Sequence, residues 1–404
     1  MSTDLLHVLL PAKRTRVEHT VARLQGERFA FNLRELSGAL GDLGTLLPLM
    51  LGTIAVVGLA PLPVLVGFAV FYIATAAYYR LPIPVQPMKA VAALLLTAQF
   101  SPAELAVSGI MIGVVLLLLG MTGWIARLAR IVPQSVLAGL QLGLGAALAL
   151  VSLELMATAP LVAVPTLVLL LGFLFVPAAP SALIAVAAAV VLATWLGAPG
   201  IGLESLSPPA LPLTVWPSLA EVERAFSLFV LPQLSLTFTN AVLLTALLAG
   251  DYFGARAAHV TPKRLAVTSG LANLLLTPLG ALPMCHGAGG LAAHHRFGAR
   301  SGSAPLVLGL ALLAIALLPG NLGLSLLAAI PAAGLGALLL MAAGELALTW
   351  RLFDCRPSCW PVIAITAGVT LWVDPFWGLL AGSAAELLRL AAMRLLFRRD
   401  ANSS

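Results

Sequence analysis

Residues 81–89 read LPIPVQPMK, and residues 280–290 read GALPMCHGAGG. The prolines of the first stretch exclude helix immediately before Pro87, and Pro283 marks a similar break in the second. Both stretches lie in a chain that is otherwise apolar over long runs. The fold therefore depends on these two interruptions and on the segments that follow them.

The segments that follow the two breaks, 87–100 and 286–298, are apolar but short. A helix needs about 20 mainly apolar residues to cross roughly 30 Å of hydrocarbon, at about 1.5 Å per residue. We therefore expect two half-helices, each of which starts inside a membrane after an extended stretch that contains proline.

The composition is that of a polytopic membrane protein. Of the 404 residues, 60% are hydrophobic and 9% are charged, whereas about a quarter of the residues are charged in soluble domains. So few polar side chains cannot coat a compact surface, which excludes a water-soluble globule. The three cysteines are too few for a disulfide framework, and no CxxC, HExxH or Walker A spacing occurs. We expect no metal site, no cofactor, no ATPase engine and no enzyme.

Reading the chain with a window of about 20 residues gives twelve full-length spans, which with the two half-helices make fourteen segments. A cytoplasmic N-terminus then places 20 of the 22 Lys and Arg residues on the cytoplasmic side. This bias predicts an integral protein of the plasma (inner) membrane with both termini in the cytoplasm. The net charge of +6 is therefore explained by membrane orientation and does not indicate a nucleic-acid partner. The expected spans are 32–54, 60–80, 103–123, 134–155, 158–176, 179–197, 226–250, 262–281, 303–319, 323–348, 360–373 and 375–397.

The sequence also contains an internal repeat. A shift of 198 residues lays FNLRELSGALGDLG, from Phe31, over FVLPQLSLTFTNAV, from Phe229. Because seven segments per half is an odd number, the second half enters the membrane from the opposite side, and such inverted repeats place a site near the bilayer midplane. The expected divisions are a cytoplasmic N-terminal segment 1–30, a first repeat 31–197, an extracytoplasmic loop 198–225, a second repeat 226–397 and a cytoplasmic tail 398–404.

Two carboxylates stand out in the first span. Glu35 and Asp42 are seven residues apart, which places them on one helix face about 10 Å apart. A charged side chain at the bilayer centre costs roughly 2.5–3.5 kcal/mol, so such groups usually face a cavity and serve transport or proton relay. Their counterparts in the second repeat are the amides Gln233 and Asn240. An alternative for Glu35 is a position among the lipid headgroups.

The starts of the two half-helices are the candidate substrate site. Unpaired backbone amides and the positive end of each helix dipole favour an anion there, and Lys89 adds a full positive charge. The glycines could instead serve helix packing, and His286 could be a hydrogen-bonded structural imidazole. Four basic residues beyond the second half-helix, His294, His295, Arg296 and Arg300, are interpreted as a positive-inside anchor. The candidate binding residues are Gln86, Met88, Lys89, Cys285, His286, Gly287, Ala288 and Gly289.

At ELSGALGDLGT, PVQPMKAVAA, QLSLTFTNAV and PMCHGAGGLAAHHRFGARSG, from about Phe31 to the last span, the sequence resembles the molybdate transporter family, a branch related to the SulP sulfate permeases. The resemblance implies an all-α fold of fourteen segments in seven-plus-seven inverted repeats, shared with the uracil permeases. It also implies that the two half-helices meet near the midplane and frame the substrate, and that Glu35, Asp42, Gln233 and Asn240 line the site. Met284 departs from the family, whose members often carry a second cysteine there, and no STAS domain is expected after the last span.

These observations predict a secondary active importer of a tetrahedral oxyanion, molybdate first and sulfate second, that works by rocking of a core domain against a gate domain. The expected partners are the oxyanion, protons as the coupling ion and the lipid bilayer, with a homodimer left open. The alternatives are a permease for a nucleobase or another small solute, for which Lys89 would be an odd choice, and a passive anion channel.

Overall fold

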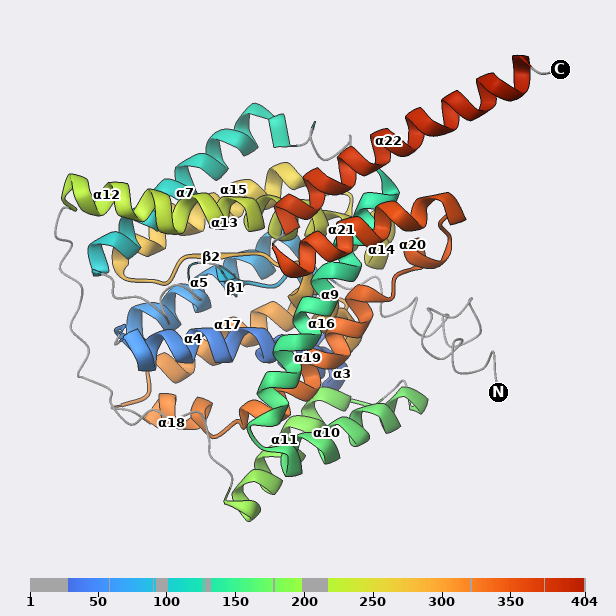
Figure 1. Cartoon of the computed structure of the whole chain (residues 1–404). Helices are drawn as coiled ribbons and strands as arrows, with labels where there is room; N and C mark the ends of the chain where they lie inside the picture. Colours follow the sequence, from blue (N-terminus) through green and yellow to red (C-terminus); the bar gives the residue numbers. More distant parts are fainter. Residues whose placement is uncertain are drawn as a thin grey trace.

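The described part of the chain is mostly helical in the computed structural model (Figure 1). Five described helices are long and apolar enough to cross a membrane, and a pair bent by 59°, α18 with α19, makes a sixth. The chain is an integral membrane protein, and the total of fourteen segments stays a prediction. Most of the N-terminal segment, of the first half-helix and of the loop 198–225 lies outside the described residues. The structure describes residues 28–57, 59–89, 91, 101–125, 127, 132–176, 179–197, 217–319, 322–373 and 375–402.

The first half begins with a helix that is interrupted at Asp42, which ends α3 and directly precedes α4. Prolines start α5, α7 and α10, where the missing N–H is not needed. The described elements of this half are α3 (Leu33–Gly41), α4 (Leu43–Val57), α5 (Pro61–Tyr79), β1 (Gln86–Pro87), α7 (Pro102–Thr122), α9 (Gln134–Ala157), α10 (Pro160–Gly172) and α11 (Ser181–Leu196).

The second half begins with one continuous helical stretch that contains two wide π-helical segments, Phe226–Val230 and Thr237–Leu244. Such segments are rare and frequently lie at functional sites. The other elements are α12 (Leu219–Ala225), α13 (Leu231–Leu236), α14 (Thr245–Phe253), α15 (Pro262–Leu276), β2 (Met284–Cys285), α16 (Ala288–Arg296), α17 (Ser303–Ala316), α18 (Leu322–Ala328), α19 (Ala332–Ala347), α20 (Trp350–Phe353), α21 (Trp360–Trp372) and α22 (Pro375–Asn402).

The helix packing follows the predicted repeat. The second segment of each half packs against the fourth segment of the other, as α5 does on α17 and α15 on α7, while the fifth segments α9 and α19 pack on each other. At the crossing of α7 and α15, a Cβ added to Gly113 or to Gly270 would lie 2.9 Å from the carbonyl oxygen of the other glycine. Bare backbone at this crossing lets the helices approach closely. This reciprocal pattern is what two interlocked halves related by a twofold axis produce.

The elements form two groups. By place in the chain, one comprises the first four segments of each half, α3, α4, α5, α7, both strands and α12 to α17, and the other comprises the later helices α9, α10, α11, α19, α21 and α22. In Figure 1, α10 and α11 lie at the bottom and α7, α12 and α13 at the top, with α9, α16 and α19 between them. The first group holds both broken segments, so it corresponds to the expected core, and α16 packs on α19 of the second group.

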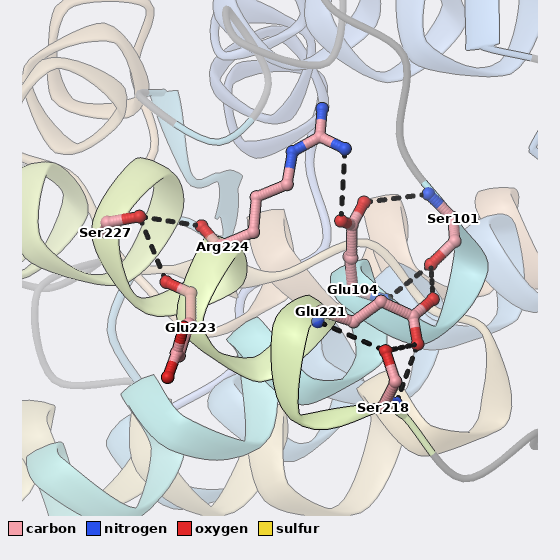
Figure 2. Close-up of polar contacts among 7 residues, drawn as sticks. All are labelled: Ser101, Glu104, Ser218, Glu221, Glu223, Arg224 and Ser227. Carbon is pink, nitrogen blue, oxygen red and sulfur yellow. Dashed lines mark hydrogen bonds and ion pairs between the residues drawn. The ribbon is translucent and has the colours of Figure 1, made fainter.

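The starts of α7 and α12 are joined by polar side chains (Figure 2). Each helix has a capping box, Ser101 with Glu104 on α7 and Ser218 with Glu221 on α12. The Ser101 hydroxyl donates to Glu221 at 2.7 Å, and Arg224 lies 3.5 Å from Glu104. The hydrogen bond from the Ser218 backbone N–H lowers the pKa of the Glu221 carboxyl. These contacts tie the fourth segment of the first half to the first segment of the second.

Candidate functional site

The two broken segments meet as a short antiparallel sheet, in which Gln86 pairs with Cys285 and Pro87 with Met284. The sequence predicts a half-helix from residue 87 after an extended stretch, and the structure differs by two residues, because Gln86 and Pro87 form a strand and helix resumes at Lys89. The prolines keep this stretch extended. The backbone N–H of Met88 donates to the Pro283 carbonyl at 2.9 Å.

The other side of β2 is held by a side chain of α15. Asn273 donates from Nδ2 to the Met284 carbonyl at 2.6 Å, and its Oδ1 accepts from the Met284 N–H at 3.0 Å. One amide side chain thus replaces the next strand of the sheet. Sequence reasoning missed Asn273, because an Asn in an apolar helix does not show which backbone it will contact.

The second half-helix, α16, begins at Ala288, two residues later than His286, where the sequence predicts it to begin. The Ala288 N–H donates to Asn240 Oδ1 at 3.2 Å. The N–H of Val91, at the start of the first half-helix, donates to Gln233 Oε1 at 3.4 Å. The two amides of the second repeat therefore contact the first turns of both half-helices.

Asp42 lies at the centre of a buried polar network. Its Oδ1 accepts from Thr45 Oγ1 at 2.5 Å and from Gln86 Nε2 at 2.6 Å, and its Oδ2 accepts from the Tyr72 hydroxyl at 3.1 Å. Gln86 Nε2 also donates to Thr45 Oγ1 at 2.5 Å. Asp42 is fully buried and Gln86 is 1% exposed. The structure thus brings Asp42 and Gln86 together, and it adds Thr45 and Tyr72, which the sequence analysis did not single out.

His294 belongs to this network and is not a surface anchor, so that interpretation is wrong for this residue. It is fully buried, its Nδ1 lies 2.8 Å from the Gly38 carbonyl, and its Nε2 lies 3.8 Å from Asp42 Oδ2. This close approach to α3 is possible because Gly38 has no side chain; a Cβ there would press on Ala299, which follows α16. Gly290 and His294 are four residues apart and so share one helix face, a spacing that could have identified His294.

Glu35 lies apart from Asp42. Its Oε1 accepts from the Arg300 backbone N–H at 2.9 Å, beyond the C-terminal end of α16, whereas Asp42 contacts the residues of β1. Next to Arg300 in this region, His295 stacks on Tyr252 at 3.9 Å and bonds to Glu345 of α19 at 3.1 Å. The structure therefore does not bring Glu35 to the junction of the two broken segments.

His286 links the two broken segments. Its Nδ1 lies 2.8 Å from the Pro84 carbonyl and its Nε2 lies 2.8 Å from Thr268 Oγ1. The ring also contacts Phe71 and Tyr79, with centroids 5.1 Å and 5.6 Å away. Both ring nitrogens are occupied, so the imidazole is placed as a structural cross-link and offers no free donor to a ligand.

Lys89 presents a buried ammonium to the junction. Its Nζ is buried and has no hydrogen-bond partner among the described residues. Gln86 Oε1 is likewise buried without a partner in the described part of the chain. Met88, Cys285 and Ala288 are buried around these groups. Lys89 Nζ and Gln86 Oε1 are therefore a buried donor and a buried acceptor for which the described residues offer no partner.

The glycines of α16 face different neighbours. A Cβ on Gly287 would collide with Gln86 Oε1, and a Cβ on Gly290 would lie 2.6 Å from Asp42 Oδ1. A Cβ on Gly289 would instead lie 2.8 Å from Leu148 of α9, in the other group of helices. Gly287 and Gly290 thus border the polar network, and Gly289 borders the interface between the two groups.

Comparisons with known proteins agree with this architecture. A family model described as "Molybdate transporter of MFS superfamily" matches residues 34–148 and 225–346, more than half of the chain. Molybdate transporter 1 of Arabidopsis thaliana is 30% identical, over 88% of this chain and 87% of its own length. Molybdate transporter 2 of the same plant is 31% identical, over 90% of this chain and 88% of its own length.

Two solved structures show the same fold. The transmembrane domain of the cyanobacterial bicarbonate transporter BicA superposes with a TM-score of 0.59 at 18% identity, covering 86% of this chain and 96% of that one. The murine Solute Carrier 26 family member A9 superposes with a TM-score of 0.58 at 15% identity, covering 97% of this chain and 72% of that one. The predicted SulP-like fold is confirmed. The relatives that match are transporters and not enzymes, and the chain belongs to the molybdate transporter family.

Proposed function

We propose that the protein is a secondary active transporter that imports a tetrahedral oxyanion, molybdate first and sulfate second, with protons as the coupling ion. The observation that carries this proposal is the buried ammonium of Lys89, which has no hydrogen-bond partner among the described residues. A buried unpaired charge is costly, and it is retained where a ligand of opposite charge completes it.

The surroundings of Lys89 suit an oxyanion. The first turn of α16 starts at Gly287 and contains Gly289 and Gly290, which have no side chains of their own between an anion and the backbone N–H groups. The positive end of the helix dipole adds to the charge of Lys89. A neutral nucleobase would leave the Lys89 ammonium uncompensated, which argues against a nucleobase permease.

Asp42 is the proposed coupling residue. It is the buried carboxylate closest to the junction, it bonds to Gln86 of β1, and it faces His294 of α16. A dianion that enters a site next to a carboxylate is repelled unless the carboxylate takes up a proton. Substrate and proton therefore favour each other at this site. Alternating access would follow from movement of the group that holds both broken segments against the group that contains α9 and α19.

The names of the relatives support the choice of molybdate. Two Arabidopsis proteins that align with most of this chain are named molybdate transporters, and a Chlamydomonas reinhardtii molybdate transporter is 39% identical over 199 residues, 48% of this chain. The proposed location is the plasma (inner) membrane, with both termini cytoplasmic, because of the distribution of Lys and Arg.

Transport in proteoliposomes tests the proposal. Purified protein should accumulate molybdate against its concentration gradient only when a proton gradient is imposed, and a protonophore should abolish accumulation. Competition should rank molybdate and tungstate with or above sulfate and well above uracil. Molybdate flux that only equalises the two sides under every gradient would identify a passive channel, and uptake of uracil alone would identify a nucleobase permease.

A further inference from the structure

We propose that the Gln86 side chain is a switch that turns its acceptor or its donor end toward the substrate according to whether Asp42 carries a proton. This inference rests on the proposed function and assigns the step that makes oxyanion binding depend on proton binding. The observation behind it is the orientation of one buried amide between a carboxylate and the start of α16.

The neighbours of Gln86 fix its orientation. An ionised carboxylate only accepts hydrogen bonds, and Asp42 Oδ1 lies 2.6 Å from Gln86 Nε2. The Thr45 hydroxyl donates its hydrogen to Asp42, so Thr45 Oγ1 can only accept from Gln86. The Gln86 atom 2.5 Å from Thr45 Oγ1 must therefore be the donor Nε2. Both neighbours require the NH₂ end, and the hydrogen-bond network thereby assigns the amide.

The other end of the amide, the acceptor Oε1, then faces the start of α16, where the proposed anion needs hydrogen-bond donors. Gln86 Oε1 lies beside Gly287, the residue that caps α16, and has no hydrogen-bond partner among the described residues. An unsatisfied carbonyl oxygen at this place repels an oxyanion, although Lys89 and the helix start attract one. With Asp42 ionised, the site is therefore only partly suited to its substrate.

Protonation of Asp42 reverses this situation. A carboxylic acid carries an O–H donor, so Gln86 can turn its amide by half a turn and accept that hydrogen bond with Oε1. Nε2 then faces Gly287 and can donate to an oxygen of the substrate. The orphaned carbonyl oxygen gains a partner, and the substrate gains a donor. Because linkage is reciprocal, an oxyanion that binds this arrangement raises the affinity of Asp42 for its proton.

Three titratable groups face Asp42 from the elements packed around it. The Tyr72 hydroxyl of α5 donates to Oδ2 and can do so in both states. His294 of α16 points Nε2 at Oδ2, and its Nδ1 carries a hydrogen because it faces the Gly38 carbonyl. Lys89 favours the ionised carboxylate until a bound anion neutralises its charge. Binding of the anion at Lys89 thus weakens one of the interactions that favour the ionised form of Asp42.

The Gln86→Met variant tests the switch, because methionine has a similar length and no amide. We would measure the molybdate affinity of the purified full-length protein across the acid to neutral pH range. For the wild type, affinity should rise by up to about tenfold per pH unit of acidification, since one proton binds with the anion. Gln86→Met should show a clearly weaker dependence, because only the direct repulsion between Asp42 and the dianion remains, with weaker binding than wild type in acid and equal or tighter binding near neutrality.

Gln141→Met is the matched control. Gln141 is also a buried glutamine, but it lies on α9, where its Oε1 accepts from Thr349. This variant should keep the wild-type pH profile. Thr45→Val is a second, independent test of the switch, because it removes the hydroxyl that accepts from Gln86 Nε2 and keeps the shape of the side chain. It should shift the pH profile so that tight binding extends to higher pH.

The outcomes separate the two proposals. A folded Gln86→Met protein that keeps the wild-type pH dependence overturns the switch and leaves the proposed function intact. If Gln86→Met does not fold, an unshifted profile in Thr45→Val overturns the switch in the same way. A wild-type protein that binds neither molybdate, tungstate nor sulfate at any pH overturns the proposed function, and the switch with it.

Discussion

Replacing Lys89 by Gln tests the proposed site most directly. The change removes the charge and keeps a polar side chain of similar reach. If the ammonium contacts the oxyanion, the variant loses a hydrogen bond to a charged group, which contributes about 1.5–3 kcal/mol. At about 1.4 kcal/mol per factor of ten, molybdate affinity should fall roughly 10- to 150-fold.

The melting temperature of the substrate-free protein is a second measurement, and it should not fall in the variant although the affinity does. Lys89 Nζ is buried without a hydrogen-bond partner in the described part of the chain, so its charge costs free energy when no anion is bound. Lys89→Gln should therefore weaken binding without lowering the melting temperature of the substrate-free protein. Molybdate should raise that temperature in the wild type and much less in the variant.

Calorimetric titration and thermal unfolding of the same detergent-purified samples would measure both quantities. Lys263→Gln is the matched control, because Lys263 is exposed at the start of α15 and far from the junction in sequence. It should leave both readings unchanged. Unaltered molybdate affinity in a folded Lys89→Gln protein would remove Lys89 from the site and with it the main support for an oxyanion substrate.

Three further changes test separate parts of the argument. Asp42→Asn should keep molybdate binding but lose proton-driven accumulation in proteoliposomes; accumulation with the wild-type pH dependence would move the coupling site elsewhere. Gly287→Ala should lower affinity with little effect on the melting temperature, because its Cβ would fill the space between the start of α16 and Gln86, whereas Gly289→Ala should mainly slow transport through its contact with Leu148; the reverse pattern would make Gly287 a packing residue. Ser101→Ala should cost about 1 kcal/mol of stability through the lost cap and leave molybdate affinity unchanged, as paired unfolding and binding titrations would show.

Much of the architecture could be predicted from the sequence because its causes are local. The prolines around Pro84, and Pro283 in the second half, disfavour helix in the residues before them, and both breaks appear in the structure as extended chain. The repeat was visible as paired residues such as Phe31 and Phe229. The reciprocal packing of α5 on α17 and of α15 on α7 has the same origin, because similar apolar faces at equivalent positions seek similar partners.

The details of the site could not be predicted because they depend on contacts between distant segments. A two-residue strand such as Gln86–Pro87 has no signature of its own, and it forms here because Met284 and Cys285 lie beside it. His294 follows a run of apolar residues and precedes Arg296, which is also the pattern of a membrane-edge anchor. Its burial results from the close approach of α16 to α3 at Gly38, a contact across more than 250 positions of the chain.

The two halves use equivalent positions for different chemistry. Asn240 accepts from the Ala288 N–H and so holds the start of α16, whereas Asp42 accepts from the side chains of Gln86 and Tyr72. An amide offers the same donor and acceptor at every pH, but a carboxylate changes from acceptor to donor when it takes up a proton. The second half can therefore act as a fixed scaffold for both half-helices. In the mechanism that we propose, the dependence on protons is confined to Asp42, and a single proton bound there is enough to change the polarity that the site presents to its anion.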